Sequence, residues 1–259
     1  AGRSVNRPIS AGQGRGVWRV GASSGIGAAC AQLLAQQGAR VAVSARRAEA
    51  LAQLGLPDGS LMLPMDALRA EQWQQSLGRV VAAWGGIDLV LICHADYQPT
   101  RAWELQREVA QRMVDINLGS VYTGLATVLP QLLAQQCGGI GMIASVAGYF
   151  GMPNALTYAP MKAALINLAE NLYLDLAPRG LGVYLICPGF VDTRLTRSNP
   201  FSMPALQTPA QAAQAILHGL QCGKFEIHFP KRFTWLMQLL RLLPFSWRSY
   251  LLQRRVNHA

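Results

Sequence analysis

Short apolar segments alternate with longer stretches of helical composition along most of this chain. Strands are predicted at 17–20, 40–45, 61–65, 87–93, 140–145 and 181–187, and helices at 28–37, from 48, at 70–84, within 102–136 and at 155–177. The strand segments are almost wholly apolar, which is typical of parallel strands covered by helices on both faces. The alternation therefore predicts an α/β fold with one doubly wound parallel sheet.

No internal repeat or low-complexity linker divides the chain, so we expect one main domain. The boundaries predicted are a flexible leader at 1–16, the main domain at 17–229 and an apolar, basic helical extension at 230–259. Half of the residues (51%) are hydrophobic and 14% are charged, which is enough apolar material for a large core. The leader has no signal-peptide pattern.

Charge and cysteine content exclude several classes of function. The net charge is +10, but the cations gather in the first fifteen residues, at 46–47 and at 231–255. No zinc-finger spacing or RNA-binding aromatic motif accompanies them, so we expect no nucleic-acid partner. The five cysteines include no C-x-x-C pair. We therefore expect a reducing, cytoplasmic environment, no disulfide framework and no metal site.

A glycine-rich segment, GASSGIG at 21–27, lies between the first predicted strand and the first predicted helix. Glycine allows a sharp turn and close approach of a phosphate, and the free N–H groups of the helix start face that anion. A plain strand–helix turn is the alternative. The position between strand and helix favours nucleotide binding. The residues expected to form this site are Gly21, Ser23, Ser24, Gly25, Ile26 and Gly27.

The end of the second predicted strand indicates which nucleotide is bound. Dinucleotide folds that use NAD often place an acid there to bind the ribose 2′-hydroxyl. This chain has Arg46 and Arg47 instead, and arginine suits a 2′-phosphate. A solvated surface pair is the alternative interpretation. The sequence therefore favours NADP(H) over NAD(H).

Motifs further along the chain occur in a familiar order. Ser145 is followed thirteen residues later by Tyr158 and then by Lys162 in a Y-x-x-x-K pattern, and the segments DINLG and CPGFVDT flank this region. With the glycine loop, these marks resemble the short-chain dehydrogenase/reductase family over residues 17–229. The resemblance implies a Rossmann-type fold and hydride transfer between a nicotinamide cofactor and a carbonyl or alcohol.

Chemistry explains the catalytic residue types. A carbonyl that receives hydride develops negative charge on oxygen, so a proton donor must lie beside it. Tyrosine needs a nearby cation to act as a base near neutral pH, and Lys162 lies one helical turn beyond Tyr158. The resemblance implies that Lys162 also holds the nicotinamide ribose, that Ser145 faces the same oxygen and that Asn117 serves a water relay. It also implies cofactor contacts at Asp66, Ala67, His94, Ala95, Asn117, Tyr158, Lys162, Pro188, Gly189, Val191 and Thr193.

Several residues depart from the family pattern. Val20 replaces a threonine before the first glycine, and Arg19 places a charge inside a strand that should be buried. His94 and Asp96 replace an asparagine and a glycine near the adenine ribose. They lack a third ligand, so a metal site is not expected. Pro160 is tolerated only if the Tyr158 helix begins close to it.

The segments after the last motif indicate an apolar substrate. Residues 190–207 form a long, apolar, proline-containing stretch typical of a mobile lid, with ordinary loop packing as the alternative. Residues 231–255 mix arginines with leucines and aromatic residues and contain no run of ~18 apolar residues, so they should not span a bilayer. Peripheral membrane contact, a pocket lid or dimer contact, and simple core cover remain alternatives, with Pro244 dividing the segment in two.

These observations together predict an NADP(H)-dependent oxidoreductase that interconverts a carbonyl and an alcohol on a small apolar substrate. The alternative is a non-catalytic NADP-binding or membrane-associated interaction protein. By resemblance, the helical regions around 102–136 and 155–177 form the surfaces of a homodimer or homotetramer.

Overall fold

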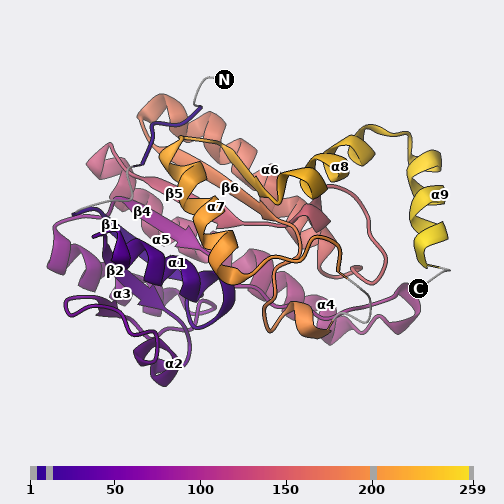
Figure 1. The fold of residues 1–259 in the computed structure, drawn as a ribbon. Helices are drawn as coiled ribbons and strands as arrows, with labels where there is room; N and C mark the ends of the chain where they lie inside the picture. Colours follow the sequence, from indigo (N-terminus) through magenta and orange to yellow (C-terminus); the bar gives the residue numbers. More distant parts are fainter. Residues whose placement is uncertain (1–4, 10–13, 199–202, 257–259) are drawn as a thin grey trace.

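The computed structural model describes residues 5–9, 14–198 and 203–256, and these residues form a seven-stranded, all-parallel sheet (Figure 1). The strand order is β3-β2-β1-β4-β5-β6-β7. The strands are β1 (Gly16–Val20), β2 (Arg40–Ser44), β3 (Leu61–Met62), β4 (Leu89–Ile92), β5 (Gly139–Ile143), β6 (Gly182–Pro188) and β7 (Glu226–Phe229). This is the predicted Rossmann-type sheet.

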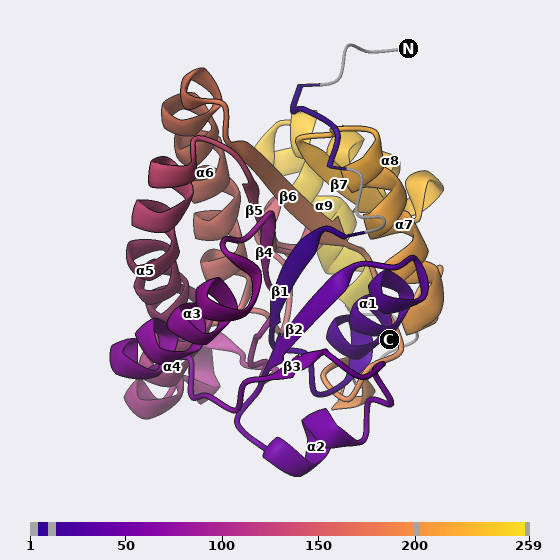
Figure 2. The same cartoon turned by 90° about the vertical axis from the view of Figure 1, so that its left-hand side faces the viewer.

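Helices cover both faces of the sheet. The helices are α1 (Gly25–Gln36), α2 (Ala48–Ala52), α3 (Ala70–Trp84), α4 (Arg107–Val114), α5 (Ser120–Gln135), α6 (Ala159–Leu176), α7 (Pro209–Gln221), α8 (Lys231–Leu242) and α9 (Phe245–Val256). Figure 2 shows α3, α5 and α6 on one side of the sheet and α1 and α7 on the other. The doubly wound arrangement expected from the alternation is confirmed.

The core follows from the alternation of side chains along each strand. Val90 and Ile92 of β4 pack on the side of α3, α5 and α6, whereas Leu89 and Leu91 pack on the side of α1 and α7. All four are almost fully buried. Successive strand residues point to opposite faces, so a strand that is apolar at every position feeds two cores at once.

The sheet order places a crevice at the carboxyl ends of β1 and β4. The chain leaves β1 toward β2 on one side, and β4 continues the sheet on the other side. The connecting helices therefore diverge at this point, and open α/β sheets bind ligands in such a crevice.

Some boundaries differ from those expected. Helix α6 begins at Ala159 rather than near 155, which puts Pro160 in the first turn, where its missing N–H costs nothing. The long helical region predicted around 102–136 contains α4, a π-helical turn (Asp115–Gly119) and α5. The tail is two helices separated at Pro244, as predicted.

The first residues of the chain are partly ordered against the sheet. The side chain of Asn6 is buried, donates to the carbonyl of Val183 at 2.7 Å and accepts from its N–H at 3.0 Å. The carbonyl of Arg7 accepts from the Tyr184 hydroxyl. Residues 5–9 therefore differ from the flexible leader expected at 1–16. The Asn6 side chain attaches them to β6 through hydrogen bonds with the carbonyl and the N–H of Val183.

Candidate functional site

A cleft of about 640 Å³ opens at the carboxyl ends of β1, β2, β4, β5 and β6. Its volume lies within the range of about 300–1,000 Å³ typical of ligand sites. Nearly all of the predicted site residues line it. They are Gly21, Ser23, Ser24, Gly25, Ile26, Gly27, Arg46, Asp66, Ala67, His94, Ala95, Ser145, Tyr158, Lys162, Pro188, Gly189, Val191 and Thr193. Arg47 and Asn117 are not among the lining residues, and their contacts with a cofactor stay predictions.

The glycine loop has a shape that only glycine permits. Gly21 has a φ of 86°, and a Cβ there would lie 2.4 Å from the backbone nitrogen of His94. A Cβ on Gly27 would lie 2.1 Å from the carbonyl oxygen of Gly21. The helix α1 starts after Ser24, whose side chain makes no capping hydrogen bond. The first N–H groups of α1 are therefore free to bind an anion, as the loop sequence predicts.

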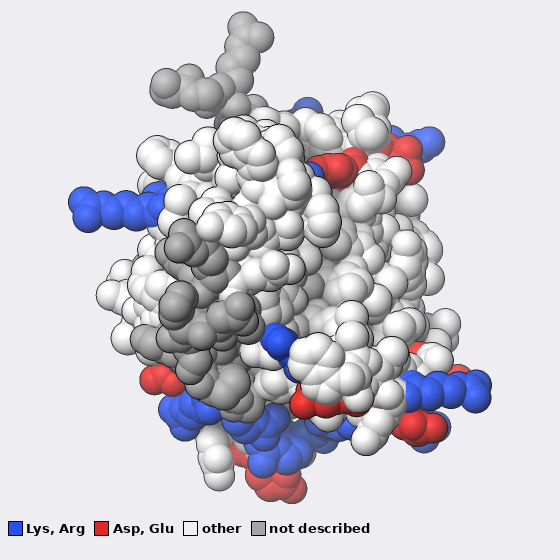
Figure 3. All heavy atoms as spheres, turned by 90° about the vertical axis from the view of Figure 1, so that its right-hand side faces the viewer, with Lys and Arg blue, Asp and Glu red and all other residues white. Residues whose placement is uncertain are grey.

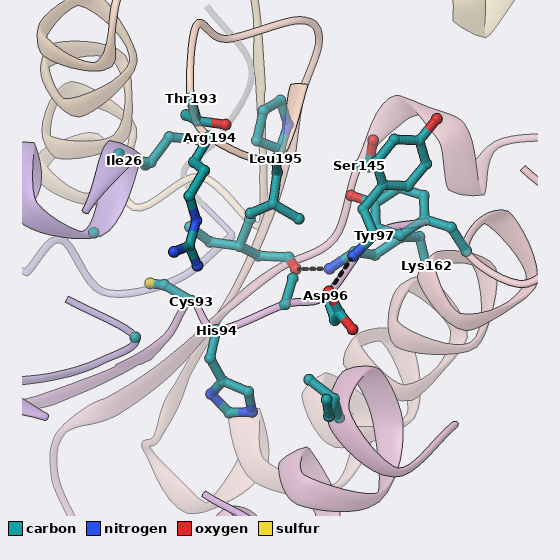
Figure 4. A pocket seen from close by; sticks show the side chains of 18 of the residues that line it. Ile26, Cys93, His94, Asp96, Tyr97, Ser145, Lys162, Thr193, Arg194 and Leu195 are labelled. Atoms are coloured by element: carbon teal, nitrogen blue, oxygen red, sulfur yellow. Dashed lines mark hydrogen bonds between the residues drawn. The ribbon is translucent and has the colours of Figure 1, made fainter. Parts of the chain in front are cut away.

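Three of the four expected catalytic side chains, those of Ser145, Tyr158 and Lys162, line the cleft, and Asn117 does not. Ser145 follows β5, Tyr158 immediately precedes α6, and the N–H of Lys162 donates to the carbonyl of Tyr158 at 3.1 Å. One turn of helix thus separates tyrosine and lysine, as the spacing predicts. Lys162 is 1% exposed, and its Nζ donates to the carbonyl of Ile143 at 3.0 Å. Figure 4 shows Ser145, Tyr97 and Lys162 close together on the same side of the cleft.

Burial controls the protonation of this group. Burial raises the pKa of Tyr158, and its hydrogen bond with Ser145 acts in the opposite direction. Burial lowers the pKa of Lys162 to about 8. Tyr158 therefore carries its proton at neutral pH, and Lys162 can change charge within a physiological range.

Asn117 holds a neighbouring loop in place. Its side-chain nitrogen donates to the carbonyls of Asp96 at 3.0 Å and Met113 at 3.1 Å, and its oxygen accepts from the N–H of Asp96 at 3.2 Å. The amide is thus largely used by backbone partners. The carboxylate of Asp96 forms an ion pair with Arg112 at 2.9 Å, which offsets the negative charge that it brings to the cleft.

His94 is oriented away from the catalytic group. Its Nε2 hydrogen-bonds to the hydroxyl of Ser120, while its buried Nδ1 has no partner among the described residues. Figure 4 shows the ring pointing away from Ser145 and Lys162. Burial, reinforced by Lys162, lowers its pKa to about 4, so the ring is neutral. The part of the chain that the structure describes contains no group of three metal-ligating side chains.

Arg194 is a cleft residue that the sequence analysis missed. It directly follows Thr193, whose Cγ2 would lie 3.0 Å from a Cβ on Gly25 of the glycine loop. Figure 4 shows its side chain extending from the loop into the cleft. Among the described residues it forms no hydrogen bond or ion pair. Arg194 could have been predicted from the sequence because it directly follows Thr193, the last residue of the CPGFVDT motif.

Arg19 lies beneath the glycine loop and is fully buried. Its Nε donates to the carbonyl of Gly27 at 2.9 Å, and its Nη2 donates to that of Ile26 at 3.4 Å. Its Nη1 is buried without a partner among the described residues. Two carbonyl oxygens of α1 thus serve as the hydrogen-bond partners expected for this buried charge, and the described residues supply no carboxylate to it.

Comparisons with known proteins agree with this architecture. The family model described as short chain dehydrogenase matches residues 17–201. An uncharacterized oxidoreductase from Myxococcus xanthus is 31% identical over 229 residues, covering 86% of this chain and 90% of that protein. An uncharacterized oxidoreductase from Staphylococcus aureus is 32% identical over 205 residues, covering 77% of this chain and 88% of that protein.

Solved structures show the same fold. A crystal structure of a short-chain type dehydrogenase/reductase from Mycobacterium marinum has a TM-score of 0.75 at 24% identity, covering 86% of this chain and 96% of that chain. A short-chain dehydrogenase/reductase from Burkholderia phymatum in complex with NAD has a TM-score of 0.80 at 22% identity, covering 89% and 94%. From the family match and the curated relatives, this chain belongs to the short-chain dehydrogenase/reductase family and is an oxidoreductase.

Proposed function

We propose that this protein is an NADP(H)-dependent oxidoreductase that interconverts a carbonyl and an alcohol on an apolar substrate, with Tyr158 as the general acid and base. One observation carries the proposal: Ser145, Tyr158 and Lys162 all line the cleft that the glycine loop closes at its other end. A phenol, a hydroxyl and an ammonium group together can donate a proton to a carbonyl oxygen and stabilise the negative charge that develops there.

The residues of the cleft fit a dinucleotide phosphate. The glycine loop leaves room for a diphosphate, and Arg194 lies where its guanidinium can reach that group. Arg46 follows β2 and lines the cleft, and no carboxylate accompanies it at the strand end. This arrangement supports NADP(H) over NAD(H). When bound, the nicotinamide supplies or accepts the hydride.

Each catalytic side chain has a separate task in the proposed reaction. The Tyr158 hydroxyl donates its proton to the carbonyl oxygen as negative charge develops there, and the Ser145 hydroxyl donates a hydrogen bond to the same oxygen. The phenolate left behind is stabilised by the ammonium of Lys162, which lies 5.4 Å from the centre of the tyrosine ring. In alcohol oxidation the same phenolate takes the proton back.

Apolar side chains near the catalytic group support an apolar substrate. Met152, Phe190 and Leu195 line the same cleft as Tyr158, and Tyr97 packs its ring edge-on against Tyr158 with centroids 4.9 Å apart. Such a wall gains free energy by removing apolar substrate surface from water.

We also propose a homodimer or homotetramer assembled through α5 and α6. Figure 2 shows the two helices side by side on one flank of the molecule. On α5, Tyr122 and Leu133 are exposed apolar side chains. A second copy packed there would bury them, and closed symmetric assemblies use the same patch on both subunits.

The test replaces Tyr158 with phenylalanine and measures reduction of a panel of apolar aldehydes and ketones with NADPH. Tyr158→Phe should lower kcat/KM by about 10²–10⁴-fold, the usual contribution of a positioned acid, and leave the Kd for NADPH unchanged. The matched control is Tyr97→Phe, which removes a second phenol from the same cleft and should retain most activity. Undiminished turnover by Tyr158→Phe would refute the assignment.

A non-catalytic role in NADP binding is the second candidate, favoured only by the altered His94 and Asp96 positions. A fluorescence titration with NADPH, run beside the activity panel, separates the two candidates. Tight NADPH binding without turnover on the whole panel would support the non-catalytic role, and absence of NADPH binding would refute both.

A further inference from the structure

The helices α8 and α9 carry large apolar side chains on their outer surface. We call this set the C-terminal face. Its members are Trp235, Leu236, Leu239, Leu242, Phe245, Trp247, Tyr250 and Leu251. Leu242 is 80% exposed, Phe245 76% and Trp247 67%. Figure 1 shows α9 at the edge of the molecule, beyond α8 and away from the sheet.

The side chains of the C-terminal face do not attach α8 to the rest of the protein. Helix α8 already attaches to the body through its other side, where Thr234 and Met237 are buried and Leu240 packs against the core. The side chains of the outer stripe, at Trp235, Leu239 and Leu242, recur at helical spacing and face solvent. Several large apolar side chains exposed along one helix face indicate an interaction site, whereas single exposed apolar residues need no explanation.

The charge of the segment indicates the chemistry of the partner. Residues 231–259 contain six Lys and Arg residues and no Asp or Glu. In the described part, Lys231, Arg232 and Arg241 are exposed next to the apolar stripe. Figure 3 shows the side of the molecule that carries these helices as a broad, largely uncharged area, with Lys and Arg and some Asp and Glu toward its edges. Aromatic and leucine side chains with cations and no anions are complementary to an anionic lipid surface.

The segment lies beside the substrate end of the cleft. The ring of Phe233 on α8 packs against Phe190, which lines the cleft, with centroids 5.7 Å apart. On α9, the guanidinium of Arg248 lies 5.2 Å from the ring centre of Phe150, two residues before the cleft residue Met152. A surface that docks on these helices is therefore adjacent to the entrance that an apolar substrate would use.

We propose that the C-terminal face docks the protein on an anionic membrane surface, with α8 and α9 lying in the interface rather than crossing it. Among the described residues, no helix is long and apolar enough to span a bilayer. Trp235 and Trp247 enter the interfacial layer, and the cations contact lipid phosphates. This inference is independent of the proposed reaction, because docking requires neither cofactor nor turnover.

The experiment measures sedimentation of the full chain with vesicles of phosphatidylcholine alone and of phosphatidylcholine mixed with an equal part of phosphatidylglycerol. Binding should be stronger to the anionic vesicles and should weaken with added salt. The double variant Leu239→Glu/Leu242→Glu should lower the vesicle partition coefficient at least about tenfold, because it places carboxylates in the interface. Arg232→Gln/Arg241→Gln should remove most of the preference for anionic lipid.

The control is Leu68→Glu, which alters a leucine that is 49% exposed on the turn before α3, away from the C-terminal face and from the proposed subunit surface of α5 and α6. It should bind vesicles like the wild type. Light scattering on each variant measures the alternative occupant, a second copy of the chain. If the wild type binds neither vesicle and Leu239→Glu/Leu242→Glu instead reduces the oligomer mass, the face is a subunit interface and the membrane proposal is wrong. Equal binding by that variant and the wild type would also overturn it.

Discussion

The ammonium nitrogen of Lys162 lies 5.4 Å from the centroid of the Tyr158 ring. The two residues are separated by one helical turn, and the backbone hydrogen bond from Lys162 to Tyr158 fixes that separation. Both side chains lie in a cleft whose wall is largely apolar, so their charges are poorly screened by water. A positive charge on Lys162 therefore acts on the Tyr158 ring through surroundings that screen it weakly.

Carbonyl reduction should depend on the charge of Lys162. Burial lowers its pKa to about 8, so the side chain is a cation below that pH and neutral above it. The value of kcat/KM for reduction should therefore fall as pH rises through about 8, because the neutral amine no longer stabilises the Tyr158 phenolate. In Lys162→Arg the charge persists, so the falling limb should move to higher pH. If kcat/KM falls at the same pH in Lys162→Arg as in the wild type, the group whose titration causes the fall is not Lys162.

Gly148 should control the distance between Ser145 and the catalytic helix. A Cβ on Gly148 would lie 2.7 Å from the backbone carbon of Lys162 and 2.8 Å from the nitrogen of Ala163, so only glycine allows this approach. Gly148→Ala should cost about 1–3 kcal/mol of unfolding free energy and lower kcat more than cofactor affinity. The control is Gly151→Ala, whose Cβ would meet nothing within 4 Å. Equal kcat in the two variants would contradict the prediction.

Arg46 and Arg194 should contact different phosphates of the cofactor. Arg46→Gln should weaken the binding of 2′-AMP and NADPH but not that of ADP, because it removes the contact to the 2′-phosphate. Arg194→Gln should weaken the binding of ADP and NADPH but not that of 2′-AMP, because it removes a contact to the diphosphate. Each loss should be about tenfold or more in Kd by fluorescence or calorimetric titration.

Two neighbouring arginines provide matched controls for this pair. Arg47 does not line the cleft, and Arg197 pairs with Asp192 at 3.3 Å on the exposed side of the loop. Arg47→Gln and Arg197→Gln should change none of the three affinities appreciably. A loss of ADP binding in Arg197→Gln equal to that in Arg194→Gln would mean that net charge, not position, is responsible.

The fold could be predicted because each local signal agreed with the global pattern. The central strands are apolar at nearly every position, and this property alone requires cover on both faces. The break at Pro244 was also predictable, since proline removes a helical hydrogen bond. The π-helical turn at Asp115–Gly119 was not, because periodicity hardly distinguishes it from the helices on either side.

The sequence predicted those parts of the candidate site whose geometry follows from residue spacing. It could not predict the parts whose geometry depends on tertiary contacts. The interval from Tyr158 to Lys162 is one helical turn, so their proximity follows from the sequence. The amide of Asn117 is instead held by the backbone of Asp96, which a linear pattern cannot show. Arg46 and Arg47 are adjacent in sequence, and only the start of α2 decides which one lines the cleft.

Arg19 should increase cofactor affinity at the expense of stability. Its guanidinium is fully buried, donates to the carbonyls of Ile26 and Gly27, and lies beside the thiol of Cys93. Burial raises the pKa of Cys93 to about 12, so this thiol is neutral, and within the described ranges Arg19 forms no ion pair that would offset the buried charge. Such a charge costs free energy in the unliganded protein, but it lies directly beneath the loop that would receive a diphosphate.

Arg19→Leu should therefore raise the melting temperature of the unliganded protein by about 2–10 °C, because it removes the desolvation cost and the unpartnered Nη1. The same variant should raise the Kd for NADPH about tenfold or more, because it removes the positive charge under the diphosphate. Arg19→Lys is the control that keeps the charge, and it should retain more of the affinity than Arg19→Leu. Differential scanning calorimetry with and without NADPH measures both effects. If Arg19→Leu lowers the melting temperature and leaves the Kd unchanged, Arg19 only supports the first turn of α1.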